Sequence, residues 1–589
     1  MAPTCGILPD RALALVRMVL AGILLAAAVG WSSAAAPATA VFESPAAPPV
    51  AGRIDELVFA QLARLNLPPV LCSDAVFVRR AFLDITGTLP TAAEVRAFLA
   101  DPDTANKRRR LIDTLLERPE YADYWAMKWG DLLRIKAEFP VNLWPNAAQA
   151  YHRWVRAAVA SNLPYDRFAR ELLTASGSNF RVGPANFYRA IQNRTPEGIA
   201  VAVALTFMGA RAENWPAERR ADMAVFFSQV GYKPTSEWKE EHVFWDPLGT
   251  SAATGNTAPG RPAVATIAET LAKAPAVAPV PPSTAPDKPR NARLPDGTTV
   301  VLPPDRDPRE VFADWLVDAK NPSFTHPIAN RVWSWFLGRG IVQEPDDFRA
   351  DNPPANPALL AYLADELVSH RFDLKHLFRL ILNSSTYQMT AMPRGTTPEA
   401  AAAFASYPLR RLDAEVLIDA INRITGTTDL YTSPIPEPYT YIPADMPAVA
   451  IADGSITSPF LALFGRSARA TGMENERDHK PVPAQWLHLL NSSHIQRKLE
   501  QGPKLKAVLD SGKAPAAVVE ELYLTFLSRF PTEAEQKEAA TLGQLQTVRP
   551  AKGAKAPPGP PKTVLVKRRE DWLDLAWALL NSSEFLFRH

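Results

Sequence analysis

Six charged side chains in the second half of the chain have the types and the spacing to bind a polar ligand. They are Arg331, Asp346, Asp347, Arg349, Arg411 and Glu415. Arg411 and Glu415 are four residues apart, which places both on one face of a helix. If the six groups line a cleft, their guanidinium and carboxylate groups grip a polar ligand. If they are buried, they form an ion network that locks a loop to a helix, and this second interpretation is the favoured one.

The loop at 344–351 is acidic enough to raise the question of a bound cation. Calcium prefers several oxygen ligands, and Glu344, Asp346, Asp347 and Asp351 supply carboxylates. Their spacing differs from that of the twelve-residue calcium loop, so a network of arginine and aspartate is favoured over a cation. We therefore predict no metal site.

Catalytic signatures are missing from the sequence. It contains no nucleophile elbow, zinc-protease motif, phosphate-binding loop or haem-attachment motif, and its 9 histidines show no metal-ligand spacing. A carboxylate-dependent hydrolase acting on cell-surface or extracellular glycans remains an alternative, since glycosidases use paired carboxylates. Its candidate acids are Asp346, Asp347, Glu415 and Glu474.

Helices with clear ends must position these residues. A helix is predicted over 309–319, and Asn321-Pro322 separates it from an aromatic helix that follows. Apolar residues at helical spacing, from Ile328 to Phe336, form a buried stripe in that second helix, and Arg331 falls off the stripe. Gly338 is suited to end the helix in the left-handed conformation.

The rest of the chain also shows helical periodicity, so the predicted fold is mainly α. Pro90–Glu94 and Pro531–Glu535 each have the pattern of a capping box at a helix start. Arg80 and Asp84 are one helical turn apart, and an ion pair between them is predicted. The segment 431–459 is rich in proline and is expected to form a long irregular loop.

The N-terminal 40 residues have the pattern of a secretory signal. Arginines precede a short apolar run, Met18–Val29, which leads to Ala38-Thr39-Ala40. Cleavage there would leave Cys72 as the only cysteine, and we interpret it as structural. The sequence thus predicts a periplasmic or extracellular protein with no later transmembrane segment; an uncleaved N-terminal anchor is the alternative.

Composition bounds the domain organisation and the partners. The 64 basic and 62 acidic residues nearly balance, which argues against a nucleic-acid partner. A stretch at 249–290, rich in alanine and proline, reads as a disordered linker. We predict two helical domains, at 41–248 and 291–589, joined by this linker.

Long ordered motifs carry a resemblance to a known pair of domains. Phe77–Gly87 followed by Leu89-Pro90-Thr91 resembles the opening of the planctomycete cytochrome-C-like domain. The second half resembles its companion, a planctomycete-type domain of unknown function. The matching motifs include Ala313-Asp314-Trp315, Asn330-Arg331-Val332-Trp333, Asp346-Asp347-Phe348-Arg349 and Arg411-Leu412-Asp413-Ala414-Glu415.

The resemblance implies a secreted protein whose activity is largely unassigned. Many relatives carry a C-x-x-C-H-type segment after the position of Gly209, and a C-x-C-x-R pattern near 474–477. This sequence has neither, so we expect no haem and no other cofactor.

Two functions follow as hypotheses. The first is a non-catalytic extracytoplasmic binding or assembly protein, whose partner is a secreted protein or a cell-surface polymer. It rests on the missing catalytic motifs, on the 14 Trp and 13 Tyr residues, and on the proline-rich segment at 431–459. Core packing is the competing explanation for most of those aromatic side chains. The second hypothesis is the glycan hydrolase.

Overall fold

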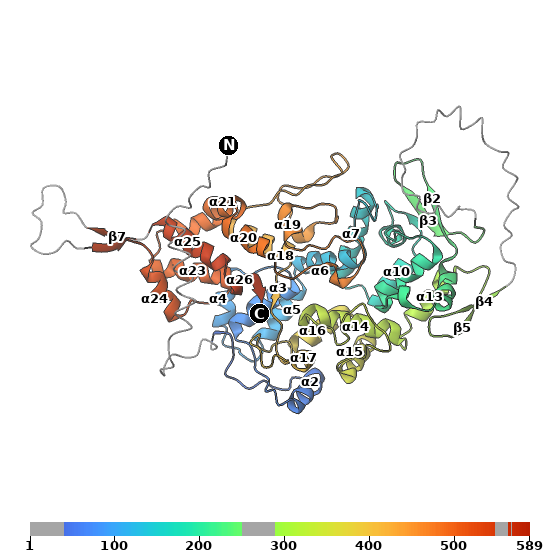
Figure 1. Ribbon diagram of the computed structural model, residues 1–589, viewed down its shortest axis with the longest axis horizontal. Helices are drawn as coiled ribbons and strands as arrows, with labels where there is room; N and C mark the ends of the chain where they lie inside the picture. Colours follow the sequence, from blue (N-terminus) through green and yellow to red (C-terminus); the bar gives the residue numbers. More distant parts are fainter. Residues whose placement is uncertain (1–40, 250–288, 548–562, 567) are drawn as a thin grey trace, which may run out of the picture. The chain divides into compact units, whose positions relative to one another are not determined.

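The computed structural model describes residues 41–249, 289–547, 563–566 and 568–589. Within them helices predominate, which confirms the mainly α prediction (Figure 1). The α-helices are α2 Arg53–Arg64, α3 Asp74–Ile85, α4 Ala92–Ala100, α5 Lys107–Leu116, α6 Pro119–Leu132, α7 Pro145–Ala160, α8 Tyr165–Leu173, α9 Asn186–Arg189, α10 Pro196–Met208, α11 Ala217–Ala224, α13 Pro308–Leu316, α14 Pro322–Leu337, α15 Pro357–Ser369, α16 Leu374–Asn383, α17 Pro398–Ala402, α18 Ala414–Thr425, α19 Pro459–Leu463, α20 Pro483–Asn491, α21 Ser493–Gln501, α22 Pro503–Leu509, α23 Pro515–Leu527, α24 Glu533–Thr541, α25 Arg569–Leu580 and α26 Ser583–Leu586.

The described strands are short and form small antiparallel sheets. One sheet has three strands in the order β1-β3-β2, and the others pair β4 with β5, β6 with β9, and β7 with β8. The strands are β1 Gly177–Ser178, β2 Val230–Pro234, β3 Glu241–Trp245, β4 Arg290–Arg293, β5 Thr299–Leu302, β6 Arg410–Arg411, β7 Gln544–Thr547, β8 Thr563–Val566 and β9 Phe587–Arg588.

Helix ends follow the local chemistry of the sequence. The side chain of Asn321 accepts a hydrogen bond from the backbone N–H of Ser323, and Pro322 occupies the first turn of α14. Gly338 ends this helix with φ +65°, the left-handed conformation that glycine adopts without a steric penalty. The two predicted capping boxes are also present, at the starts of α4 and α24. These expectations from the sequence are confirmed.

Aromatic side chains from both halves of the chain build one core. Trp125 of α6 lies 5.0 Å from Trp335 of α14 and 4.5 Å from Phe378 of α16, measured between ring centroids. Phe336 packs beside them, 5.6 Å from Trp125. Tilted and edge-on contacts of this kind bury large apolar surfaces and fix the ring orientations. The core therefore joins α6 to helices that follow it by some 200 residues.

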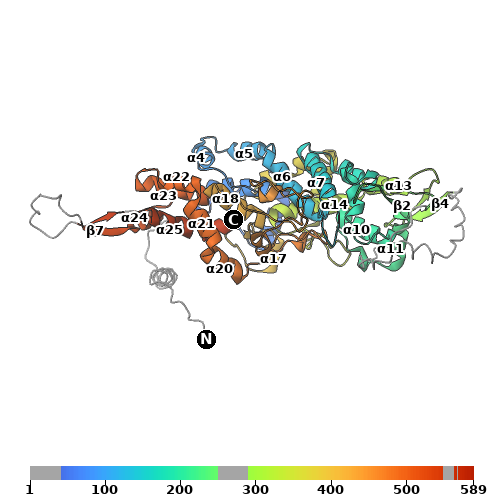
Figure 2. The same ribbon diagram turned by 90° about the horizontal axis from the view of Figure 1, so that it is seen from above.

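Residues Phe42–His589 form one compact unit, and the division into two domains at 249–290 stays a prediction. α4 packs against α23, and Figures 1 and 2 both show them side by side. The buried Arg79 of α3 donates to the carbonyls of Phe526 and Phe585, each at 2.8 Å. A buried guanidinium needs acceptors, and these lie in the other half of the sequence, so the two halves pack together.

Two predicted segments fall largely outside the described residues: the signal segment at 1–40 and all but the two ends of the linker at 249–290. Among the described helices, none combines the length and the apolar character needed to cross a bilayer.

Limited proteolysis tests the linker and the packing together. We expect the first cut between Gly249 and Arg290, where the sequence predicts a linker. Because buried groups such as Arg79 bridge the halves, the two fragments should still co-elute on size exclusion after cleavage. Fragments that separate without denaturant would contradict this packing and would favour two independently folded domains.

Candidate functional site

Arg331 and Asp346 form a buried ion pair at the end of α10. Arg331 Nη2 lies 2.7 Å from Asp346 Oδ1, and Arg331 Nη1 donates to the carbonyl of Thr206 at 2.8 Å. Burial works against the charge of Arg331, but the Asp346 carboxylate outweighs it and holds the pKa of Arg331 above its usual range. Asp346 Oδ2 also accepts the backbone N–H of Glu474 at 2.6 Å. This pair therefore joins three separate parts of the chain.

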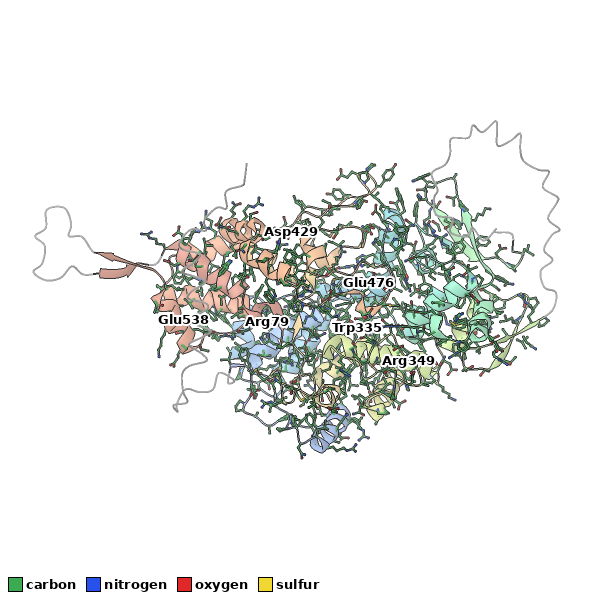
Figure 3. All side chains as sticks on the ribbon, in the orientation of Figure 1. Arg79, Trp335, Arg349, Asp429, Glu476 and Glu538 are labelled. Carbon is green, nitrogen blue, oxygen red and sulfur yellow. The ribbon has the colours of Figure 1, made fainter. Side chains whose placement is uncertain are left out.

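Arg349 is exposed and Asp347 is half-buried, although both adjoin this buried pair in the sequence. Arg349 Nε is 3.3 Å from Asp347 Oδ2 and 3.4 Å from Asp351, and its side chain is 57% exposed. Exposed ion pairs of this kind contribute at most about 1 kcal/mol to stability. Figure 3 shows Arg349 well away from Asp429, a residue of the cavities described below.

Glu415 belongs to a different buried network. Arg477 Nη1 donates to Glu415 Oε2 at 2.6 Å, and Arg477 Nη2 donates to Asp131 Oδ2 at 2.7 Å. Arg466 Nε is 3.2 Å from Glu415, and Arg469 Nε is 2.9 Å from Asp131. Three arginines of one irregular segment thus connect α6, which carries Asp131, to α18, which carries Glu415.

The side chain of Arg411 binds backbone carbonyl groups of the same irregular segment. Arg411 Nη2 donates to the carbonyls of Phe464 and Asp478, at 2.8 Å each. The six candidates therefore occupy separate places: the pair Arg331 and Asp346, the surface pair Asp347 and Arg349, and the surroundings of segment 464–478. Within each of the first two pairs the side chains are in contact. The six residues do not share one cleft.

Glu474, the remaining candidate acid, is half-buried beside the aromatic core. Its Oε1 accepts the indole N–H of Trp335 at 3.0 Å. Burial, with the Asp346 carboxylate nearby, raises the pKa of Glu474, and the cations Lys128 and Arg331 act against this. Glu474 is thus one of the residues through which segment 464–478 is held in place.

A cavity of about 420 Å³ was not anticipated from the sequence. α18 contributes Asp419, Asn422 and Arg423 to it. The proline-rich segment at 431–459 contributes Asp445, Met446, Pro447, Val449 and Ala450. Carboxylate, amide and guanidinium groups thus share one space of ligand size. The remaining lining residues are Gly87, Thr88, Leu89, Glu120, Asp123, Ala420, Gly426, Thr427, Thr428 and Lys504.

Asp419 ties the proline-rich segment to α18. Its Oδ1 accepts the backbone N–H of Ala448 at 2.8 Å, and its Oδ2 accepts that of Val449 at 3.0 Å. Burial raises the pKa of Asp419 to about 7, although the two N–H donors favour the ionised form. A carboxyl group that titrates near neutral pH inside a cavity is typical of functional sites.

This shift predicts a measurable pH dependence of stability. Between the ordinary pKa of aspartate, about 3.9, and about 7, the folded protein retains a proton that the unfolded chain loses. The wild-type free energy of unfolding should therefore fall as pH rises through this window, by up to about 1.4 kcal/mol per unit, relative to Asp419→Asn. Urea denaturation of both proteins at several pH values measures the difference, and parallel curves would contradict the shift.

A second cavity, of about 490 Å³, adjoins the first and shares Thr427 and Thr428 with it. We call the two together the twin cavities. In the second one, Asp429 Oδ1 lies 2.8 Å from His494 Nε2, and His494 Nδ1 lies 3.3 Å from His488 Nε2. Lys498 Nζ is 3.3 Å from Asp429 Oδ2. Burial lowers the pKa of His488, so this ring is the neutral end of an Asp–His–His chain.

Exposed aromatic rings lie beside segments that are separate in sequence. Tyr439 stacks edge-on against Trp144 at 5.3 Å, and Lys239 Nζ lies 5.8 Å from the ring of Trp144 and 5.2 Å from that of Trp238. Trp238 is 69% exposed and Tyr441 is 73% exposed. Two further exposed rings are close to these in the sequence: Phe139 precedes Trp144, and Tyr441 follows Tyr439. We call the whole set the aromatic ledge: Phe139, Trp144, Trp238, Tyr439 and Tyr441. Large apolar side chains gathered at a surface mark interaction sites.

The twin cavities and the ledge share one segment of the chain. The residues between α18 and α19 extend beyond α19 at the top of Figure 1. They supply Tyr439 and Tyr441 to the ledge, and Asp445 to the first cavity. The proline-rich composition had indicated this irregular segment, but Asp429 and His494, which are 65 residues apart, form no motif that the sequence reveals.

One cavity is lined by residues near the two positions at which a haem motif is missing from the sequence, after Gly209 and at 474–477. Its volume is about 550 Å³, and its lining includes Glu213, Arg220, Thr471 and Met473. The lining described for it contains neither cysteine nor histidine. The absence of haem stays a prediction.

Two family models match the chain. Residues 53–215 match PSCyt2, described as "Protein of unknown function (DUF1549)". Residues 308–542 match PSD1, described as "Protein of unknown function (DUF1553)". No curated protein and no solved structure matches the chain significantly. The chain carries the planctomycete cytochrome-C-like domain followed by its companion domain of unknown function, in that order.

Proposed function

We propose that this protein is an extracytoplasmic binding protein whose ligand is a polysaccharide of the cell surface. The observation that carries the proposal is the proline-rich segment between α18 and α19. It presents exposed rings at its outer part and walls a cavity lined by carboxylate and amide groups at its inner part. Apolar faces and convergent polar groups along one segment suit an extended, amphipathic ligand.

Sugar chemistry matches both parts of this surface. The flat faces of Trp238 and Tyr441 pack against the C–H face of a pyranose ring, and they need little conformational ordering to do so. Asp445, Asn422 and Arg423 supply acceptors and donors for the hydroxyl groups. A chain of several sugars occupies the ledge and the first cavity at once.

The N-terminal sequence supports the proposed compartment. Its arginines, short apolar run and Ala38-Thr39-Ala40 have the order of a secretory signal. Export would bring the ledge into contact with periplasmic or extracellular polymers. A secreted protein partner is the other ligand class that the sequence left open, and the experiment below distinguishes the two.

The geometry gives the hydrolase alternative less support. A glycosidase needs two carboxyl groups that face one substrate. Asp346 is held by Arg331, Glu415 is held by Arg466 and Arg477, and both carboxylates are buried. Asp346 and Glu415 are therefore committed to the framework and do not form such a pair.

Sedimentation with insoluble cell-wall polysaccharide tests the proposal. Wild type should co-sediment, and the double variant Trp238→Ala/Tyr441→Ala should bind about tenfold more weakly, because two stacked rings contribute about 0.5–1.5 kcal/mol or more. Both side chains are exposed, so the free energy of unfolding should change by no more than about 0.5 kcal/mol.

Phe530→Ala is the matched control, since Phe530 is an exposed ring outside the ledge. It should bind like wild type. Unchanged sedimentation of the double variant would contradict the proposal. If the wild-type protein does not bind polysaccharide but binds a secreted protein through the ledge, the ligand is a protein and the proposed polysaccharide is wrong.

A further inference from the structure

We infer that Glu366, His370 and His376 form a binding site for a divalent transition-metal ion of the zinc type. Glu366 lies in the last turn of α15, and His370 follows one turn later as the residue that ends this helix. His376 lies in the first turn of α16. The tight connection between the two helices brings the second histidine back toward the first two residues.

The separations of the ligand atoms suit one small ion. Glu366 Oε2 lies 3.1 Å from His376 Nε2 and 3.5 Å from His370 Nδ1. All three ligand atoms lie within 4.8 Å of one another. In a tetrahedral site with bonds of about 2.0–2.1 Å, neighbouring ligand atoms are about 3.3 Å apart. Two of the three separations match this geometry, and the third requires one histidine ring to turn.

The ligand types select the class of metal. Two imidazoles with one carboxylate suit zinc, copper or nickel, whereas calcium and magnesium prefer oxygen ligands alone. Three protein ligands leave a coordination position for water or for a group from a bound molecule. The C-terminus of α15 adds the negative end of the helix dipole, which favours a cation at this place.

Neighbouring groups hold the ligands in position. The hydroxyl of Tyr362, one turn before Glu366 on α15, is hydrogen-bonded to the Glu366 carboxylate. The rings of His370 and His376 are stacked, with centroids 3.5 Å apart and planes 12° apart. The lone pair of an imidazole lies in the plane of its ring, so both rings bind one ion only after one of them turns out of this stack. The side chain of His370 is 46% exposed and has room to turn. Oriented ligands with outer hydrogen bonds are typical of metal sites in proteins.

If His370 only caps α15, a different response to zinc is expected. His370 Nδ1 also lies 3.0 Å from the carbonyl oxygen of Glu366 and 3.1 Å from Ser369 Oγ. A proton on Nδ1 would close the end of α15 through that carbonyl. Zinc binding releases this proton, whereas a helix cap shows no response to zinc.

Calorimetric titration of untagged protein with ZnCl2 at pH 7.5 tests the inference. We expect one zinc ion per chain and a rise in melting temperature with zinc, because a ligand that binds only the folded state stabilises it. His376→Ala and Glu366→Gln should each weaken binding at least about tenfold. CaCl2 should produce neither effect.

His242→Ala is the matched control, because His242 is an exposed histidine on β3 and is outside the site. It should bind zinc like wild type. Absence of zinc binding in wild type would overturn the inference, and so would binding that both Glu366→Gln and His376→Ala leave unchanged. If His376→Ala fails to fold, Glu366→Gln alone decides, since it removes the charge and keeps the side-chain shape.

Discussion

Asp346→Asn should lower the free energy of unfolding by about 3–5 kcal/mol, because it leaves Arg331 charged, buried and without its carboxylate. The substitution keeps the shape of the side chain, so the loss reports the missing charge. It also weakens the acceptor of the Glu474 backbone N–H. Chemical denaturation monitored by tryptophan fluorescence measures the change.

Asp347→Asn provides the matched control, one residue away in the same loop. Asp347 pairs only at the surface, with the exposed Arg349, so its replacement should change stability by no more than about 0.5 kcal/mol. The contrast between the two neighbours is the result to look for. Equal effects would show that the ion pair of Arg331 and Asp346 does not hold the loop to α14.

Arg477→Met should destabilise the protein by a similar amount, about 3–5 kcal/mol. Arg477 neutralises Glu415 and Asp131 at once, and the methionine leaves both carboxylates buried with fewer cations. The carboxylates also hold the pKa of Arg477 well above its usual range, against the effect of burial. Arg477 is thus charged at every pH at which the protein is folded.

Two further variants separate charge pairing from packing. Arg181→Met removes a guanidinium whose side chain is 77% exposed, and it should have an effect within about 0.5 kcal/mol. Adding Glu415→Gln to Arg477→Met should cost less than the sum of the single substitutions, because the partners form one network. Additive losses would show that the network is not energetically coupled.

Local features of the sequence predicted the helical elements well. Caps such as Asn321 and the stop at Gly338 act within a few residues, so their chemistry is readable without the rest of the chain. Buried charges were predicted less well. Arg80 and Asp84 have the spacing of an ion pair, yet Arg80 donates to the carbonyls of Tyr387, Met389 and His589.

The partner of Asp84 explains why this prediction was wrong. Arg588 Nη1 lies 2.9 Å from Asp84 Oδ1, across 504 residues of sequence. Partners at such separations follow from tertiary packing, and helical spacing contains no information about them. The same reason applies to Asp429 with His494. In the zinc-type site, the spacing of Glu366 and His370 is local, but His376 joins them only through the turn between two helices.

The structure thus distinguishes buried charged residues that hold the fold together from groups that line cavities or lie on the surface. Charged residues that the sequence highlighted, such as Arg331 and Glu415, hold α14 and α18 to segment 464–478. The twin cavities and the aromatic ledge, in contrast, present polar groups and exposed rings on which the proposed function rests. Arg331 and Glu415, which the sequence motifs pointed to, therefore act in packing in this structure.

Hydrogen–deuterium exchange with and without saturating cell-wall glycan tests this separation most directly. Bound ligand should slow exchange in 427–430 and 439–450, which contribute to the twin cavities and the ledge, and leave 344–351 unchanged. The measurement uses the full chain and reads both regions in one experiment. Slowed exchange at 344–351, with none at 427–430 and 439–450, would contradict the account and return the ligand site to the acidic loop.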